Sequence, residues 1–170
     1  MFTRRTRSVG VDVLAGALSG IAASWLMERA QARIMRAGSE GTRKREKKAQ
    51  GGMEPATRRT AEAAARIVGR SLGGRQKAVG GEIVHYATGA AWGALFGILA
   101  RRVPAPVVAT GAAYGVLVWL LGDELLVPAL GFSRKASAYP ASTHAKGLAS
   151  HLVYGTATDA GFRVLERVLH

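Results

Sequence analysis

Cysteine is absent from this chain of 170 residues. Its absence excludes a disulfide framework, a metal site built from thiolates and a cysteine nucleophile. Acidic residues are scarce as well, because 24 Lys and Arg residues face 11 Asp and Glu residues and leave a formal net charge of +13. No catalytic motif of recognised specificity occurs, and the zinc-protease pattern HExxH is missing. We therefore predict that the protein is not an enzyme and that it carries no cofactor and no metal.

Long apolar runs are what the chain does contain. A helix crosses the roughly 30 Å hydrocarbon layer of a bilayer with about 20 mostly apolar residues. Four stretches approach that length, at about 9–27, 83–100, 107–126 and 148–165. We predict an all-α protein, an integral membrane four-helix bundle that forms a single membrane domain over residues 1–170.

The first run also fits a secretory signal peptide, because three arginines precede it. Ala22-Ala23-Ser24 lies near its end, but Asp12 interrupts the run and the apolar residues continue through Trp25-Leu26-Met27 without a clean cleavage site, which favours a retained helix. A stiff basic turn, Arg101-Arg102-Val103-Pro104-Ala105-Pro106, joins the second and third runs. This turn predicts an antiparallel hairpin.

Glycine recurs at every fourth position within these runs. The glycines that share helix faces are Gly16, Gly20, Gly89, Gly93, Gly97, Gly111 and Gly115. In water a glycine inside a helix costs up to about 1 kcal/mol relative to alanine, whereas in lipid small residues let helix backbones approach closely. The pattern predicts glycine-rich helix contacts. The partner helix belongs either to the same chain or to a second copy, so self-association is an open expectation.

One short segment occurs twice. Residues 87–93 read Ala-Thr-Gly-Ala-Ala-Trp-Gly, and residues 109–115 read Ala-Thr-Gly-Ala-Ala-Tyr-Gly. The two copies differ only in the aromatic residue. This repeat indicates either a duplication or the reuse of a good packing pattern, and it is too short to identify an inverted-repeat transporter.

Most of the charge lies in a basic linker at about 31–81. Residues 37–52 have no apolar periodicity and predict a mobile, solvated segment. Residues 56–72, which follow Pro55, predict an amphipathic helix with arginines on one face and apolar side chains on another. Such a helix lies either along the lipid headgroups or, solvated, over the loop side of the bundle. The count of basic residues places the linker in the cytoplasm by the positive-inside rule, whereas the short basic tail and the Arg-Arg-Pro turn favour the opposite orientation.

The net positive charge fits two kinds of partner. Nucleic acids attract Lys and Arg through their phosphates. Here the basic residues lie between and beside apolar runs, where anionic lipid headgroups attract each of them for about 1 kcal/mol. We therefore predict that the partners are the lipid bilayer and its anionic headgroups. A nucleic-acid partner would need more assumptions to explain the same pattern.

Ionisable residues in or near the apolar runs are the chemical candidates. The candidate buried polar site consists of His85, Asp123, Glu124, His144, His151 and Asp159. In a membrane such groups face the bundle interior, pair with one another or line a wet cavity. His85 and His151 meet the Asp123-Glu124 pair if their helices are neighbours. His144 shares a helix face with His151 only if the last helix begins before Lys146.

A histidine beside a carboxylate has several uses. It holds two helices together, binds a ligand or ion, or relays a proton, and catalysis is the remotest of these. His and carboxylate side chains also suit zinc or iron, and two imidazoles suit haem. A histidine in a membrane helix is more often a packed hydrogen-bonding residue, so we assign no metal.

Several segments of the chain resemble those of one known family. They are Leu14-Ala15-Gly16, Trp25-Leu26-Met27-Glu28, His85-Tyr86-Ala87-Thr88-Gly89, Gly122-Asp123-Glu124-Leu125-Leu126-Val127-Pro128-Ala129-Leu130-Gly131, His144-Ala145-Lys146-Gly147 and His151-Leu152-Val153-Tyr154-Gly155. In these segments the chain resembles the YagU-like family of small bacterial inner-membrane proteins. The resemblance covers the helical parts and omits the basic linker. It implies a multi-pass protein of the bacterial inner membrane, with no established activity, substrate or cofactor.

Two classes of function follow from the sequence. The first is a structural or scaffolding role in the membrane, with self-association. The alternative is a proton, ion or small-solute carrier that uses His85, His151, Asp123 and Glu124. Histidines that face a pocket would favour the carrier, and direct pairing without a cavity would favour the scaffold.

Overall fold

The computed structural model describes residues 8–100 and 107–169, and every regular element within them is a helix. The all-α prediction is thus confirmed for this part of the chain. The stiff turn expected at 101–106 and the arginines that precede the first run lie outside the described residues.

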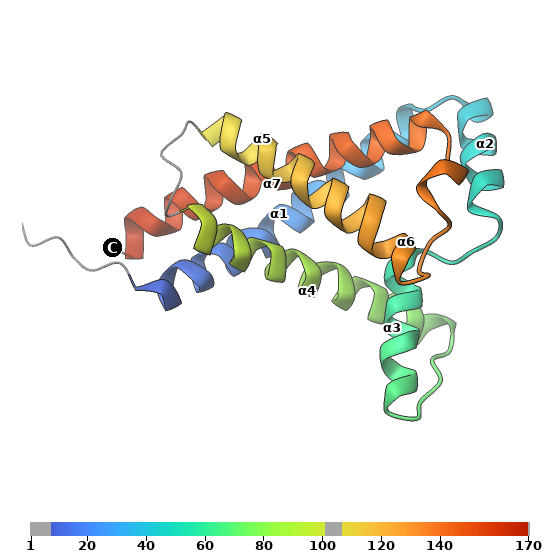
Figure 1. Cartoon of the computed structure of the whole chain (residues 1–170), viewed down its shortest axis with the longest axis horizontal. Coiled ribbons are helices and arrows are strands. Elements are labelled where there is room, and N and C mark those ends of the chain that lie inside the picture. Colours follow the sequence, from blue (N-terminus) through green and yellow to red (C-terminus); the bar gives the residue numbers. More distant parts are fainter. Residues whose placement is uncertain (1–7, 101–106, 170) are drawn as a thin grey trace, which may run out of the picture.

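Four long helical segments lie side by side, and each runs antiparallel to its neighbours (Figure 1). The elements, in chain order, are α1 (Val9–Ala37), α2 (Glu40–Gln50), α3 (Ala56–Ile67), α4 (Gly74–Ala100), α5 (Val107–Val118), the π-helix η1 (Trp119–Leu126), α6 (Val127–Ala129), the 3₁₀ helix η2 (Ala136–Ala138) and α7 (Ala141–Leu169). Because α5, η1 and α6 follow one another without a break, they form one continuous segment. Helix α4 packs on α1, α1 on α7, and α7 on α5.

Within residues 8–100 and 107–169, three helices are long and apolar enough to cross a membrane, at Val9–Ala37, Gly74–Ala100 and Ala109–Ala129. They are compatible with a multi-pass membrane protein. The fourth expected span, 148–165, lies within α7, which does not reach this apolar level among the described residues. Its inner face carries polar side chains such as Ser150, Thr158 and Asp159, each fully buried between α1 and α5. These polar residues lower the mean hydropathy of a helix that the other helices cover.

Glycines line the contact between α1 and α4. Gly16 and Gly20 of α1 face Gly89, Gly93 and Gly97 of α4. A Cβ atom added at Gly20 would lie 2.9 Å from the Cα atom of Gly93, and one added at Gly93 would lie 2.8 Å from the Cα atom of Gly20. Real Cβ atoms do not approach so closely, so this helix spacing requires glycine at both positions.

A second close contact joins α5 to α7. A Cβ atom added at Gly111 would lie 2.7 Å from the Cα atom of Thr156, and one added at Gly115 would overlap the carbonyl oxygen of His151. Gly155 of α7 faces both glycines, with its own added Cβ 2.7 Å from the Cα atom of Gly115. All the glycines that the sequence predicted to pack therefore meet backbone of the same chain.

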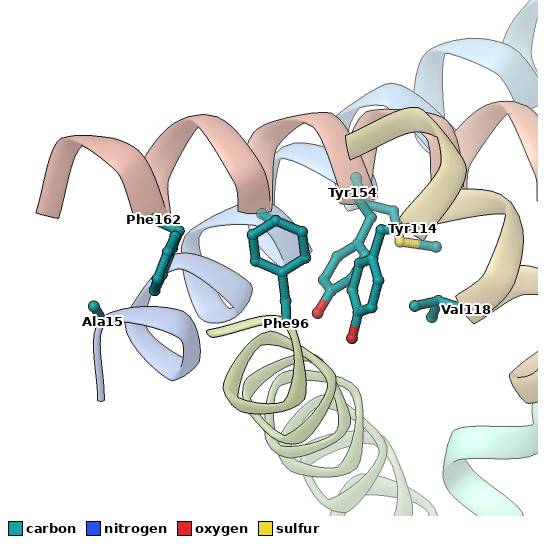
Figure 2. Packing of buried hydrophobic residues seen from close by; sticks show 8 residues of the cluster. Ala15, Phe96, Tyr114, Val118, Tyr154 and Phe162 are labelled. Atoms are coloured by element: carbon teal, nitrogen blue, oxygen red, sulfur yellow. The ribbon is translucent and has the colours of Figure 1, made fainter. Parts of the chain in front are cut away.

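Aromatic side chains fill the centre of the bundle where α4, α5 and α7 face one another (Figure 2). The ring of Phe96 lies edge-on to Tyr114, with 4.9 Å between centroids, and edge-on to Phe162, with 5.7 Å. Edge-to-face pairs of this kind add roughly 0.5–1.5 kcal/mol to the gain from burial alone. These rings fill the interior of the bundle near the C-terminal end of α4.

The prediction of a mobile segment at 37–52 is wrong, because α2 (Glu40–Gln50) is a helix. Its ends carry the usual signals. The Ser39 hydroxyl accepts a hydrogen bond from the Thr42 amide at 3.2 Å, and Gly51 takes a left-handed conformation with φ of 64°. A helix without an apolar stripe shows no periodicity, so periodicity alone could not reveal it.

The predicted helix at 56–72 is shorter in the structure, at Ala56–Ile67. Gly69, with φ of 69°, follows its end. Helix α3 packs on α4 through Ala61, whose side chain is buried. Its far end projects away from the long helices in Figure 1, and Ile67 there is 87% exposed.

Candidate functional site

Two adjoining cavities lie in the half of the bundle nearest α2 and α3. The inner cavity has a volume of about 540 Å³ and lies among α1, α3, α4, η1 and α7. The outer cavity has a volume of about 760 Å³ and lies among α2, η1, the 131–140 segment and the start of α7. Asp123 lines both cavities, and its side chain is 53% exposed. The carboxylate therefore stands where the two spaces meet.

The π-helix η1 positions the two acidic residues of the site. Pro128 has no N–H group, and its ring clashes with the carbonyl group four residues back, which belongs to Glu124. The backbone widens instead, and the Val127 amide donates to the carbonyl oxygen of Gly122, five residues back. Such π turns occur frequently at functional sites. Here the turn carries Asp123 and Glu124 toward two different histidines of α7.

Glu124 pairs with His144. The His144 Nδ1 atom lies 2.7 Å from a carboxylate oxygen of Glu124, and its Nε2 atom lies 3.2 Å from the carbonyl oxygen of Ala136. Because both partners accept, both ring nitrogens carry a proton in this arrangement. The hydrogen bond to Glu124 raises the pKa of His144, which lies before the predicted 148–165 span. The pair forms a wall of the outer cavity.

Asp123 faces His151. The His151 Nδ1 atom donates to the carbonyl oxygen of Gly147 at 2.9 Å, and the Nε2 atom lies 3.8 Å from a carboxylate oxygen of Asp123. The first bond places a proton on Nδ1 and leaves Nε2 as the ring nitrogen that faces the carboxylate. Only 9% of the His151 side chain is exposed, whereas Asp123 opens to the cavities. The geometry can hold a proton at the boundary of the inner cavity.

His85 stands on the opposite wall of the inner cavity, on α4. Its Nε2 atom lies 3.4 Å from the carbonyl oxygen of Ser24 on α1. The neighbouring Tyr86 donates to a carboxylate oxygen of Glu28 at 3.0 Å. The cavity thus has one histidine on each side, His85 on α4 and His151 on α7.

Asp159 does not belong to this group and lines neither cavity. It is fully buried on α7, accepts a hydrogen bond from the Thr110 hydroxyl and pairs with Arg163 Nε at 2.6 Å. Eight residues separate it from His151, which corresponds to about 12 Å along a helix. The structure gathers the other predicted site residues and leaves Asp159 to connect α5 with α7.

Sequence reasoning missed the aromatic residues that line the inner cavity, which include Trp92 and Tyr154. The Tyr154 hydroxyl donates to the carbonyl oxygen of Gly89 at 2.7 Å, and the Tyr114 hydroxyl donates to that of Trp92 at 2.5 Å. Trp92 and Tyr114 occupy the single differing position of the repeated segment. This differing position was a sequence signal for Trp92 and Tyr114, because it places one aromatic residue at the equivalent site of each repeat copy.

A second missed contact holds α2 against α7. Lys146 Nζ lies 2.8 Å from one carboxylate oxygen of Glu46, and the Ser142 hydroxyl donates to the other at 2.7 Å. Burial alone would raise the pKa of Glu46, but the hydrogen bonds from Lys146 and Ser142 outweigh it and hold that pKa below its usual range. Glu46 and Lys146 both line the outer cavity. The contact therefore fixes one of its walls.

Within residues 8–100 and 107–169, no group of three or more His, Asp or Glu side chains has an arrangement that could hold a metal ion. The carboxylates and imidazoles of the site stand in pairs instead.

Comparisons with known proteins give one match. The model of a family described as "Protein of unknown function (DUF1440)" matches residues 69–160. No curated protein matches the chain, and no solved structure does. The matched residues hold the histidines of the two cavities together with Glu82, Asp123 and Glu124, while Glu28, Glu46 and Glu54 and the helices α1, α2 and α3 lie before them.

Proposed function

Because this chain belongs to the DUF1440 family, whose function is unknown, we propose a function from the geometry of its site: a multi-pass membrane carrier that moves a proton, alone or with a small solute. One observation carries this proposal. The inner cavity, about 540 Å³ in volume, has His85 and the Asp123–His151 pair in its walls. Histidines that face a cavity, rather than fill a packed contact, favour a carrier over a scaffold.

Lipid contact agrees with the exposed side chains of the long helices. Large apolar residues on their outer faces remain exposed, among them Leu14, Trp25, Ile83 and Leu125, with 57%, 47%, 63% and 56% of their surfaces accessible. Hydrocarbon around the bundle would cover them. We place the protein in the bacterial inner membrane because of its resemblance to the YagU-like family.

We propose that α7 forms the fourth span, although its composition alone does not identify one. Its polar side chains point to α1 and α5, where Ser150 and Thr158 also donate to carbonyl oxygens one turn back in their own helix. Hydrogen bonds within the helix satisfy hydroxyl groups that lipid would not. A polar helix of this kind is stable in a bilayer when apolar helices flank it.

Proton exchange between His151 and Asp123 is the chemical step that the site can perform. The Nε2 atom and the Asp123 carboxylate are 3.8 Å apart, so a proton would pass between them through a bridging water or after a small approach of the two side chains, with Nδ1 held by Gly147 throughout. Asp123 faces both cavities, so the proton can pass to either space. The block of Phe96, Tyr114 and Phe162 closes the other end, and a carrier must move these rings to complete transfer.

The scaffolding role, with self-association, has less support. Its sequence basis was the set of glycine faces, and those glycines contact helices of the same chain. We retain it as the outcome if the carrier proposal fails. A non-enzymatic role and attraction of anionic lipid headgroups to the basic linker remain proposals as well.

Proton flux into vesicles tests the carrier. The protein is reconstituted in liposomes that enclose a pH-sensitive dye, and a potassium diffusion potential drives protons inward. We expect the wild type to acidify the lumen faster than empty liposomes. We expect His151→Ala and Asp123→Asn to reduce the rate to the level of empty liposomes, with helix content by circular dichroism unchanged.

A matched control is Glu62→Gln, which removes a carboxylate from α3 outside both cavities. This variant should retain the wild-type rate. Unchanged flux in His151→Ala would remove the site residues from the mechanism, and wild-type flux equal to that of empty liposomes would overturn the carrier and leave the scaffold.

A further inference from the structure

The inner cavity has the opposite charge to the chain. Overall the protein carries +13. The cavity is lined by the carboxylates of Glu28, Glu82 and Asp123, and none of the described residues that line it is Lys or Arg. Arg29, although next to Glu28, lies over the ring of the exposed Trp25 at 4.5 Å from its centroid and is not part of the lining. The lining of the inner cavity therefore contains no Lys or Arg among the described residues, although the chain is rich in both.

Glu28, Glu82 and Asp123 are all exposed residues, so their carboxylates lie on the open side of the cavity. Together they give it a negative potential, which attracts cations and repels anions. An anionic solute would meet three carboxylates without a compensating Lys or Arg. The lining therefore excludes anions as ligands of this cavity.

The carboxylates do not converge on one point, which excludes a bare metal ion as the best ligand. They come from α1, α4 and η1, and no metal-binding group is found within the described part of the chain. A larger cation can contact them across the space. The volume of about 540 Å³ lies within the range of small-molecule sites, roughly 300–1,000 Å³.

Aromatic and apolar side chains complete the lining, and they suit a cation that carries methyl or methylene groups. Trp92 and Tyr154 lie on two walls, and Val118 and Leu126 on another. Only 2% of Tyr154 is exposed and its hydroxyl donates to the carbonyl oxygen of Gly89, so the partly buried Trp92 is the ring that can contact a ligand. Aromatic rings attract alkylated ammonium groups through cation–π interaction.

We infer that the inner cavity binds a small organic cation, a substituted ammonium compound whose charge faces Asp123 and whose alkyl groups lie against Trp92. This inference rests on the proposed function, because it assigns a ligand class to the cavity of the proposed carrier. The carboxylate of Asp123 is then the charge partner of the solute as well as a proton acceptor.

Choline and its neutral isostere, 3,3-dimethylbutan-1-ol, form a matched pair of probes, because they have nearly the same shape and differ in charge. Purified protein in detergent is titrated with each while calorimetry measures binding. The emission of Trp92 gives a second reading in a Trp25→Phe, Trp119→Phe background. We expect saturable choline binding that is at least about tenfold tighter than binding of the isostere.

Asp123→Asn keeps the side-chain size and removes the charge. We expect this variant to weaken choline binding at least about tenfold and to leave the affinity for the isostere unchanged. Glu62→Gln, outside the cavity, should bind choline as the wild type does. A uniform loss for both probes in Asp123→Asn would mean a damaged fold, and Trp92→Leu then decides, because it should weaken choline more than the isostere.

The outcomes separate the two proposals. Equal affinity for choline and the isostere, or no choline binding, overturns the ligand class whether or not proton flux is seen. Saturable, Asp123-dependent choline binding without any flux supports the ligand class and overturns the carrier.

Discussion

Glu46 is the residue that ties the basic helix α2 to the bundle. Its ion-pair partner Lys146 and its hydroxyl partner Ser142 both belong to α7. Glu46 and Lys146 each keep only 16% of their side chains exposed, and partly shielded pairs are weakened less by salt than exposed ones. Because α2 is rich in Lys and Arg, trypsin cleavage within it reports how often the helix leaves α7.

We expect Glu46→Gln to accelerate trypsin cleavage within α2 by about two- to fivefold, since the variant loses the ion pair that holds the helix. Cleavage sites are mapped by mass spectrometry. Glu40→Gln is the matched control, because Glu40 pairs with Lys44 inside α2 and their side chains are 73% and 76% exposed. Equal acceleration in both variants would contradict this role of Glu46.

The same contact responds to pH with a definite sign. The hydrogen bonds from Lys146 and Ser142 lower the pKa of Glu46 in the folded protein. The contact therefore stabilises the folded state fully at pH values above the usual pKa of glutamate. This stabilisation is lost as the pH falls through the lowered pKa. We expect hydrogen exchange in α2, corrected for intrinsic rates, to accelerate below about pH 4 in the wild type. Glu46→Gln should lack this acid step.

The residues of the site were predictable as a set but not as pairs. An adjacent Asp123-Glu124 and two histidines seven residues apart indicated contact between two helices. The pairing depends on the register of α7, which begins at Ala141, and on the π turn of η1. Neither follows from residue types. Asp159 and Asp123 are the same residue type, so the sequence could not show that Asp159 lies outside the two cavities.

At the scale of elements, the helices that pack through a repeated small residue were the easiest to predict. The α1–α4 and α5–α7 contacts involve the glycines spaced four residues apart. Helix α2 was missed because the signals that predict it are the capping residues Ser39 and Gly51, whereas its interior has no apolar periodicity. Helix α3 was predicted too long, since Gly69 ends it before the apolar pattern does.

Gly93→Ala tests the α1–α4 contact. In an open helix this change stabilises by up to about 1 kcal/mol. Here the new Cβ would lie 2.8 Å from the Cα atom of Gly20 and would overlap the carbonyl oxygen of Gly16. We expect a loss of about 1–3 kcal/mol in the free energy of unfolding, measured by denaturation in detergent micelles.

Gly10→Ala in α1 provides the comparison. An added Cβ there would meet only the Ser8 hydroxyl oxygen, at 3.7 Å, among the described atoms. This variant should be neutral or slightly stabilising. If Gly93→Ala behaved in the same way, the close approach of α1 and α4 would not be a feature of the folded protein.

At the scale of the molecule, the sequence predicted three helices that the structure makes long and apolar enough to cross a membrane. It could not predict the order α4, α1, α7, α5, because that order depends on which faces fit together. Nor could it predict the cavities. They are lined by residues of helices far apart in the sequence, such as α1, α4, η1 and α7, and no local pattern encodes how those helices come together.

Integration in the bilayer has a direct test. We expect membranes isolated from expressing cells to retain the protein after washing with high salt and with alkaline carbonate, because apolar contact with lipid is insensitive to both. A surface-bound basic protein would be released, since its attraction to headgroups is electrostatic. Release into the soluble fraction would contradict the membrane reading of α1, α4 and α5.

The placement of α7 between α1 and α5 has a consequence for biosynthesis. A segment that carries Asp159, Arg163 and Glu166 is a poor substrate for insertion by itself, because each charge opposes its partition from the translocation machinery into lipid. Ribosomes complete it after α1 and α5 have been made. We expect the earlier helices to assist the insertion of α7, because they cover its polar face in the folded protein.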